Sequence, residues 1–374
     1  MQVYPSPFRA YPRMATLTTL IPAYKKEYLA ETFVGLQRQR FRDFRVILSD
    51  DSPGDEISRL IRDGHFADVL KGLALEVVPG PKNARLNQRA LIERWDGSSP
   101  LVHIHLDDDL IFPDFYRQHV EAHASGRFSA SVSRRWVTQG DTVPVYGVEQ
   151  PRFVASSPLR FVPVDERQLF STMVPTCNNW VGEFSNMVLS AVGARCFPLP
   201  PADDLSYYGW PDVGFLLEAV QRAPIVIVRD HLGVFRQHPE QTTHRMHDHG
   251  GRVSSMAWVT CALLAWREGR ISHKEAVHAI SYTVGECLKR YGEADPVINE
   301  FFSIIQREGA SLGALVAAYT PFWLRVLASH RATAPVTGPA TPAAPAASPA
   351  AAPPDGEAAA LAAVRRAMSA LIPA

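Results

Sequence analysis

An apolar run that ends in three adjacent carboxylates occupies residues 101–113, Leu-Val-His-Ile-His-Leu-Asp-Asp-Asp-Leu-Ile-Phe-Pro. Crowded carboxylates repel one another unless a positive charge lies between them, so we do not expect Asp107, Asp108 and Asp109 to form a simple solvated face. Oxygen ligands of this kind suit Mg²⁺ or Mn²⁺, which keep further coordination positions for water and phosphate. The triplet therefore predicts a metal site for a diphosphate-bearing substrate. Its alternative is a loop whose acids cap a helix.

Strand-like and helix-like segments alternate before this triplet. We expect strands at residues 16–21, 44–48 and 73–78 and in the run before the triplet, and helices at about 28–40, 56–70 and 83–95. This alternation is typical of βαβ units and predicts an α/β fold with a mainly parallel open sheet flanked by helices. Ligands of such sheets collect at the carboxyl ends of the strands. Tyr24, Asp50, Asp51 and the triplet all follow strand ends, which predicts one common site.

The rest of the chain is less regular. Short strands are expected at 143–148, 161–164 and 225–228 and a helix at 212–222, while residues 252–328 have a helical pattern with a break at Pro321. Residues 332–354 are almost wholly Ala, Pro, Thr and Ser, a composition that cannot bury a core. We therefore expect a flexible extension at 1–13, a sheet domain at 14–245, a helical region at 246–330, a linker at 331–356 and a short amphipathic helix at 357–374.

Composition and charge narrow the range of partners. The 374 residues include 38 Lys and Arg and 38 Asp and Glu, so no global field favours nucleic acid. The four cysteines have no zinc-like spacing and fit a reducing cytosol. No uncharged apolar stretch approaches the length that spans a bilayer. We expect a soluble cytoplasmic protein, attached at most peripherally to the inner face of the membrane through its tail helix. The oligomeric state is left open.

The order of the motifs resembles a family 2 glycosyltransferase of the GT-A fold over residues 14–245. The matching pieces are 20–24 (Leu-Ile-Pro-Ala-Tyr), 39–44 (Gln-Arg-Phe-Arg-Asp-Phe), 46–52 (Val-Ile-Leu-Ser-Asp-Asp-Ser), 83–87 (Asn-Ala-Arg-Leu-Asn), 106–109 with Pro113-Asp114, and 211–213 (Pro-Asp-Val). The chain departs from the family at Lys25, where Asn is usual, and at Pro211, where Glu is often found. The resemblance implies an inverting transferase that moves a sugar from a nucleotide-diphosphate sugar to an acceptor hydroxyl, with Mn²⁺ or Mg²⁺ as cofactor.

The resemblance also implies a nucleotide-binding set, which consists of Pro22, Tyr24, Asp50, Asp51, Lys82, Arg85, Asp107 and Asp108. Asp51, or its neighbour Asp50, would accept the ring N–H of the base, a contact that discriminates because leaving it unpaired is costly. Tyr24 would stack on the base or simply pack at the strand end. Lys82 and Arg85 would approach the diphosphate or stay solvated.

Two assignments of the metal ligand remain open. The Asp-x-Asp spacing makes Asp107 the ribose contact and Asp109 the ligand, whereas counting back from Pro113 favours Asp108. His238 resembles a further ligand, from the segment that closes over the diphosphate in this family. The metal would act as a Lewis acid on the departing nucleoside diphosphate.

Asp212 is the candidate general base that takes the proton from the acceptor hydroxyl. It lies at the start of an apolar helix, where the macrodipole favours an ionised carboxylate, and its alternative is an ordinary first-turn acid. A single base that assists attack opposite the leaving group implies inversion. Residues 178–186 resemble the loop that faces a carbohydrate or lipid-linked acceptor, with Asn179, Trp180 and Glu183 as candidate contacts. Trp180 would stack on a sugar face or serve as a core aromatic.

Two other functional classes remain open. A nucleotidyltransferase on a similar sheet would need a Gly-rich basic loop after the first strand, but residues 22–26 are Pro-Ala-Tyr-Lys-Lys. A catalytically silent sugar-nucleotide-binding or scaffold protein would not need Asp212 or the triplet. The high Ala, Arg and Pro content is typical of GC-rich bacterial genomes and suggests bacterial surface polysaccharide or glycolipid synthesis.

Overall fold

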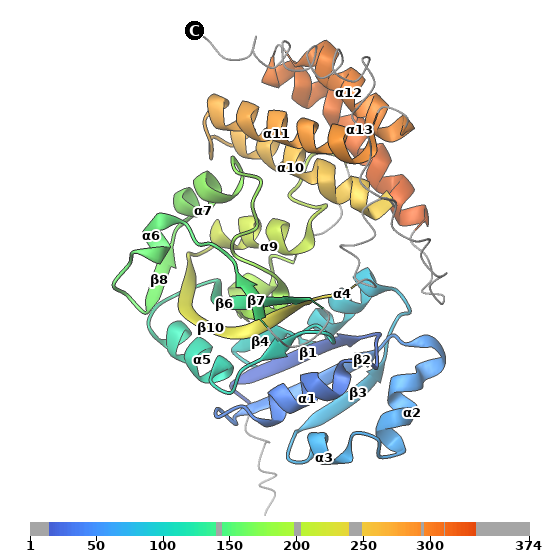
Figure 1. Ribbon diagram of the computed structural model, residues 1–374, viewed down its shortest axis with the longest axis vertical. Coiled ribbons are helices and arrows are strands. Elements are labelled where there is room, and N and C mark those ends of the chain that lie inside the picture. Colours follow the sequence, from blue (N-terminus) through green and yellow to red (C-terminus); the bar gives the residue numbers. More distant parts are fainter. Residues whose placement is uncertain are drawn as a thin grey trace, which may run out of the picture.

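A mixed sheet forms the centre of the computed structural model, which describes residues 15–139, 144–197, 203–238, 249–292, 295–309 and 311–333. Within these residues the sheet has ten strands, in the order β3-β2-β1-β4-β9-β6-β10-β5, with β7 beside β6 and β8 beside β10. Helices flank it (Figure 1). The expected α/β fold with an open sheet between helices is confirmed.

Parallel strands form the first half of the sheet. They are β1 (Leu17–Ala23), β2 (Phe44–Asp50), β3 (Leu75–Pro79) and β4 (Leu101–Ile104). The register pairs Ala23 with Asp50 and Asp50 with Pro79, so neighbouring strands end side by side. Every residue of β4 and nearly every residue of β1 is buried, as expected for strands covered on both faces. The helices that follow these strands are α1 (Leu29–Gln37), α2 (Glu56–Arg62), α3 (Ala67–Leu70) and α4 (Ala84–Trp95).

The second half of the sheet is mixed rather than mainly parallel. Its strands are β5 (Leu110–Ile111), β6 (Ala130–Gln139), β7 (Pro144–Gly147), β8 (Phe161–Val164), β9 (Met187–Ser190) and β10 (Ile225–Gln237). Strand β9 runs antiparallel between β4 and β6, while β6 and β10 are parallel. The intervening helices are α5 (Phe115–Ala124), α6 (Arg152–Ala155), α7 (Glu166–Met173), α8 (Ala191–Ala194) and α9 (Pro211–Val220).

A group of long helices lies at one end of the molecule, beyond α9 (Figure 1). It consists of α10 (His249–Arg267), α11 (His273–Tyr291), α12 (Pro296–Glu308) and α13 (Leu312–Thr333). The expected break at Pro321 is wrong, because α13 continues through this residue. Tyr319, Phe322 and Trp323 on either side of it are fully buried, and this packing offsets the hydrogen bond that proline cannot make. The predictions for 1–13 and for the linker and tail helix after residue 333 lie outside the described residues.

One helix in the described part of the chain is long and apolar enough to cross a membrane. The stretch is Leu312–Ser329 of α13, with a mean hydropathy of 1.3 and 39% of its residues buried within the fold. Helix α13 contacts both α10 and α12, and core helices of globular proteins meet the same criterion of length and composition. The expected absence of a membrane-spanning segment therefore stays a prediction.

Candidate active site

Asp107 ties the end of β4 to the loop after β1. Its Oδ2 accepts the backbone N–H groups of Tyr24, at 2.6 Å, and Lys25, at 2.7 Å. Burial and the negative charge of Asp108 raise the pKa of this carboxyl, and the two N–H donors oppose that shift. The side chain therefore fixes the β1–α1 loop and leaves its other oxygen for a ligand.

Asp108 has a different set of partners. Its Oδ2 lies 3.2 Å from Lys25 Nζ and 3.1 Å from His238 Nε2. Burial alone would raise the pKa of Asp108, but the hydrogen bond with His238 and the charge of Lys25 together lower it. Asp108 is thus held ionised although only 10% of its side chain is exposed.

Asp109 points toward β10. Its Oδ1 accepts the backbone N–H of Arg236 at 3.0 Å, and burial followed by the charge of Asp108 raises its pKa well above the usual range. The Arg236 side chain donates to the carbonyl oxygen of Asp108 at 2.9 Å and pairs with Glu31 at 2.5 Å. Its guanidinium also lies 4.3 Å from the ring centre of Tyr28. Arg236 therefore joins β10, the acidic turn and α1, a role that the sequence did not reveal.

Asp108 and His238 are the pair that best fits a divalent metal. Bonds of about 2.1 Å at right angles separate two ligand atoms by roughly 3.0 Å, and the observed distance from Oδ2 to Nε2 is 3.1 Å. No group of three or more His, Cys, Asp or Glu suited to a metal occurs in the part of the chain that the structure describes. A cation here would complete its coordination with water and substrate phosphate, as Mg²⁺ commonly does. The buried Oδ2 of Asp109 has no hydrogen-bond partner among the described residues, so both assignments stay predictions.

The two acids at the end of β2 serve different purposes. Asp50 uses both oxygens locally, because Oδ1 accepts from the backbone and hydroxyl of Ser52 and Oδ2 from the backbone of Ser58 at 2.7 Å. Asp51 accepts the backbone N–H of Lys82 through Oδ1, while its buried Oδ2 has no hydrogen-bond partner among the described residues. Burial raises the pKa of Asp51. Asp51 is therefore the better candidate to receive a base N–H.

The other residues predicted to contact the nucleotide differ in how far the structure supports that role. The ammonium of Lys82 is bound to the β2–α2 turn, at 2.7 Å from both the carbonyl oxygen of Ser52 and the carboxylate of Asp55, rather than standing free for a diphosphate. Arg85 lies in α4, but its side chain is outside the described residues. Pro22 is in β1, and Tyr24 directly follows that strand with a half-buried side chain.

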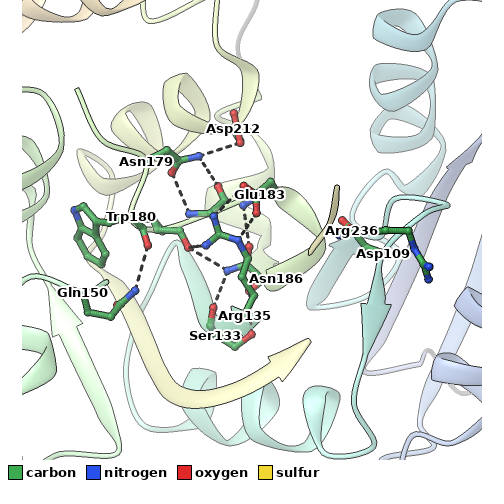
Figure 2. Close-up of polar contacts among 12 residues, drawn as sticks. Asp109, Ser133, Arg135, Gln150, Asn179, Trp180, Glu183, Asn186, Asp212 and Arg236 are labelled. Carbon is green, nitrogen blue, oxygen red and sulfur yellow. Dashed lines mark hydrogen bonds and ion pairs between the residues drawn. The ribbon is translucent and has the colours of Figure 1, made fainter. Parts of the chain in front are cut away.

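Asp212 lies in the first turn of α9, as expected from the sequence, and is half-buried. Burial, followed by the negative charge of Glu183, raises its pKa to about 7. Asn179 donates from Nδ2 to Oδ2 of Asp212 at 3.2 Å, and its own Oδ1 accepts the N–H of Gly182 at 3.0 Å (Figure 2). The residues before β9 thus supply a fixed donor to the candidate base.

A buried arginine holds the predicted acceptor loop. Arg135 on β6 pairs with Glu183 through Nε to Oε2 at 2.5 Å and Nη2 to Oε1 at 2.9 Å, and donates to the carbonyl oxygen of Val181 at 3.2 Å (Figure 2). Gly182 has a φ of 124°, and a Cβ there would lie 2.5 Å from Arg135 Nη1. No role was predicted for Arg135, although a charged residue in a strand between buried neighbours is a signal of a paired charge.

Trp180 is placed in the core, which was the alternative to stacking on a sugar. Only 1% of its surface is exposed, and its ring packs edge-on against Phe153. The indole Nε1 donates to the hydroxyl of Thr172 at 3.2 Å, and Gln150 binds the Trp180 carbonyl oxygen (Figure 2). This placement favours the core role, and stacking on an acceptor stays an untested prediction.

A small cavity joins the triplet to the acceptor loop. Its lining includes Asp109, Arg135, Glu183, Ser185 and Asn186. The negative charge of Glu183 raises the pKa of both Asp109 and Asp212, although burial is the larger cause in each case. The acidic triplet and Asp212 are far apart in the chain. The structure places them on two sides of the loop that carries Glu183.

Comparison with known proteins gives structural matches. No protein-family model matches the chain, and no curated protein does. Residues 1–349 of S. aureus TarS in complex with UDP match with a TM-score of 0.50 and 13% identity, over 85% of this chain and 91% of that one. The same part of TarS with UDP-GlcNAc gives 0.47 and 15%, over 85% and 92%. Mannosyltransferase PcManGT from Pyrobaculum calidifontis, with GDP-Man and Mn2+, gives 0.47 and 14%, over 86% and 88%. At such identities a likeness shows the fold alone, and the chain shares its fold with TarS 1–349.

Proposed function

We propose that this chain is an inverting, metal-dependent glycosyltransferase that uses a nucleotide-diphosphate sugar. The observation that carries the proposal is that the pKa values of two carboxyls are shifted in opposite directions. Asp108 is held ionised by Lys25 and His238, whereas burial raises the pKa of Asp212 to about 7. Such a division is typical of sites in which one acid binds a positive group and another exchanges a proton. The fold shared with TarS, which was crystallised with UDP, supports the proposal.

The donor would bind along the carboxyl ends of β1, β2 and β4. Asp51 would accept the base N–H through its unpartnered Oδ2, with Tyr24 against the base. Asp107 would contact the ribose. Asp108 and His238 would hold Mn²⁺ or Mg²⁺, which when bound neutralises negative charge on the departing nucleoside diphosphate.

Asp212 would act as the general base. A carboxyl with a pKa near 7 is matched to accepting a proton at neutral pH. As the acceptor oxygen bonds to the anomeric carbon, its proton passes to Asp212 and the bond from that carbon to the phosphate oxygen breaks. Attack opposite the leaving group inverts the anomeric centre. Asn179 would keep the carboxylate oriented through its 3.2 Å contact.

The remaining assignments also belong to this proposal. Residues 14–245 would form the catalytic domain and 246–330 its helical extension. Asn179 and Glu183 would shape the side that receives a carbohydrate or lipid-linked acceptor. A place on the cytoplasmic face of a bacterial membrane, in surface polysaccharide or glycolipid synthesis, would suit such a substrate.

Thermal denaturation with and without ligands tests the binding step. UDP, GDP and dTDP should be added to the full chain with and without Mn²⁺, because a ligand of the native state raises its melting temperature by mass action. We expect one nucleotide to shift the transition only when Mn²⁺ is present, and Asp108→Asn to remove the shift. Absence of a shift with every nucleotide would overturn the proposal.

Product analysis tests the chemistry. Incubation with the matching nucleotide sugar should release nucleoside diphosphate, and NMR of the product should show an inverted anomeric configuration. Release of pyrophosphate would instead identify a nucleotidyltransferase. Tight binding without any turnover would identify a catalytically silent binding protein.

A further inference from the structure

The ammonium of Lys25 lies between the two candidate metal ligands. Lys25 Nζ is 3.2 Å from Asp108 Oδ2 and 3.0 Å from His238 Nε2, and these two atoms are themselves 3.1 Å apart. The three groups come from separate segments, namely the loop after β1, the acidic turn and the end of β10. The exposed fractions of their side chains are 19%, 10% and 2%. A positive charge from the chain therefore already lies within hydrogen-bond distance of both atoms.

This position is the one that a divalent ion would need. Two ligand atoms bound at about 2.1 Å and at right angles would lie roughly 3.0 Å apart, and both would direct their lone pairs to the ion. In the present arrangement the Lys25 ammonium lies 3.2 Å from Asp108 Oδ2 and 3.0 Å from His238 Nε2, and the Nε2 lone pair faces it when the proton of neutral His238 is on Nδ1. A metal ion and an ammonium cannot share this position, since their like charges repel strongly where little water screens them. Binding of one cation must move the other.

The Lys25 side chain has an anchored base from which to move. Its backbone N–H is bound at 2.7 Å to Asp107, so the main chain stays fixed while the four-carbon side chain can change rotamer. The diphosphate that accompanies the metal would bring anionic oxygens to the same place. An ammonium that leaves Asp108 and His238 would then find a charge-assisted hydrogen bond with phosphate.

We propose that Lys25 is a tethered cation that holds Asp108 and His238 together in the ligand-free protein and that a divalent metal binds by displacing it. This inference rests on the proposed function, because it concerns the metal of the same donor site. Free metal then binds weakly, whereas metal together with a nucleoside diphosphate binds well. Lys25 thereby couples loading of the metal to arrival of the donor and protects the site from occupation by metal alone.

Binding of Mn²⁺ without nucleotide tests the inference directly. Free Mn²⁺ is measured by electron paramagnetic resonance during titration of the full chain and of Lys25→Met, which keeps the apolar length of the side chain and removes its charge. We expect K25M to bind Mn²⁺ at least about tenfold more tightly than the original chain. The matched control is Lys26→Met, because Lys26 pairs with Glu56 at 2.5 Å on the surface and should leave the affinity unchanged.

A double variant and a nucleotide complete the experiment. The gain in Mn²⁺ affinity of K25M should disappear in K25M/D108N. Saturating UDP should raise the Mn²⁺ affinity of the original chain by a larger factor than it raises that of K25M. Equal affinities in K25M and the original chain would overturn the inference, as would a gain that survives D108N or no binding of Mn²⁺ to either protein. Circular dichroism of each variant checks the fold. If K25M fails to gain affinity while Mn²⁺ still enables the thermal shift with UDP, only this inference fails; if that thermal shift is absent, the proposed function fails.

Discussion

Asn179 donates a hydrogen bond from Nδ2 to Oδ2 of Asp212 at 3.2 Å, across 33 positions of the chain. The bond favours the ionised carboxylate, whereas burial and the charge of Glu183 favour the protonated form. The backbone N–H of Val213 and the charge of Arg135 also favour the ionised form, and the pKa of Asp212 is raised to about 7. A modest change in its neighbours should therefore move its charge state within the physiological range of pH.

The rate of glycosyl transfer should rise from pH 6 to pH 8, because a general base acts only after it has lost its proton. Asn179→Ala removes a donor to the ionised form, so the midpoint of kcat/KM against pH should move upward. Gln150→Ala is the control, since Gln150 binds the same loop at the Trp180 carbonyl oxygen and is not bonded to Asp212. Identical midpoints for N179A and the original chain would argue against Asp212 as the titrating base.

Replacement of Asp212 by Asn should lower kcat at least about 100-fold, the usual contribution of a general base. It should also stabilise the fold in alkaline solution. The pKa of Asp212 is raised from 3.8 to about 7, so the folded protein binds a proton more tightly than the unfolded chain. The stability that this proton provides is complete at low pH and is lost as pH rises through about 7.

Thermal denaturation at two pH values checks the second effect. The melting temperature of D212N should exceed that of the original chain at pH 8, and the difference should become smaller or reverse at pH 5. A D212N protein that is less stable than the original chain at pH 8 would show that neighbouring groups stabilise the ionised carboxylate of Asp212 in the folded protein.

Mutation should separate the roles of the two acids at the end of β2, Asp50 and Asp51. Asp50→Ala leaves the N–H groups of Ser52 and Ser58 without their acceptor, so it should lower the free energy of unfolding by roughly 1–3 kcal/mol. Asp51→Asn keeps one oxygen for Lys82 but turns the free acceptor into a donor. UDP affinity should then fall at least about tenfold, or 1.4 kcal/mol. Calorimetric titration with UDP and Mn²⁺ decides the point, and unchanged affinity in D51N would remove Asp51 from the base site.

Trp180→Phe should reduce stability without changing the acceptor KM. The substitution removes the hydrogen bond to Thr172, a cost of about 1 kcal/mol, and leaves a small void in the core. The indole is buried and cannot reach an acceptor in the present arrangement. Urea denaturation and acceptor kinetics measure the two effects. A raised acceptor KM with unchanged stability would restore the stacking role.

The sequence predicted the parallel half of the fold well, because β1, β2 and β4 are almost wholly buried and consist mainly of apolar and β-branched residues. Strands β6 and β9 were missed. Strand β6 interrupts its apolar residues with Ser131, Ser133 and Arg135, and β9 has only four residues. Strand β10 was expected to end at Val228, where a register shift and two charged residues interrupt the pattern before it continues to Gln237.

The expectation that ligands bind at the carboxyl ends of the strands placed the acids in one region. It did not distinguish the acids that hold the loops from those available to a ligand. Asp50 and Asp107 accept backbone N–H groups, and such contacts depend on how the loops fold in space rather than on residue type. The ion pair of Arg135 with Glu183 joins residues 48 positions apart and has no local pattern. Lys25 was visible as a departure from the family motif, but its meeting with His238 required the three-dimensional fold.

Arg236 links a partly exposed residue, Glu31, to the acidic turn of the candidate donor site. Glu31 is 46% exposed on α1, and its carboxylate holds the guanidinium that also anchors the acidic turn. His238 follows Arg236 by two residues. A neutral side chain at position 31 would remove this ion pair and loosen the end of β10. Evolution or protein engineering could thus change the affinity for the donor at a partly exposed position, without altering any group that contacts the donor.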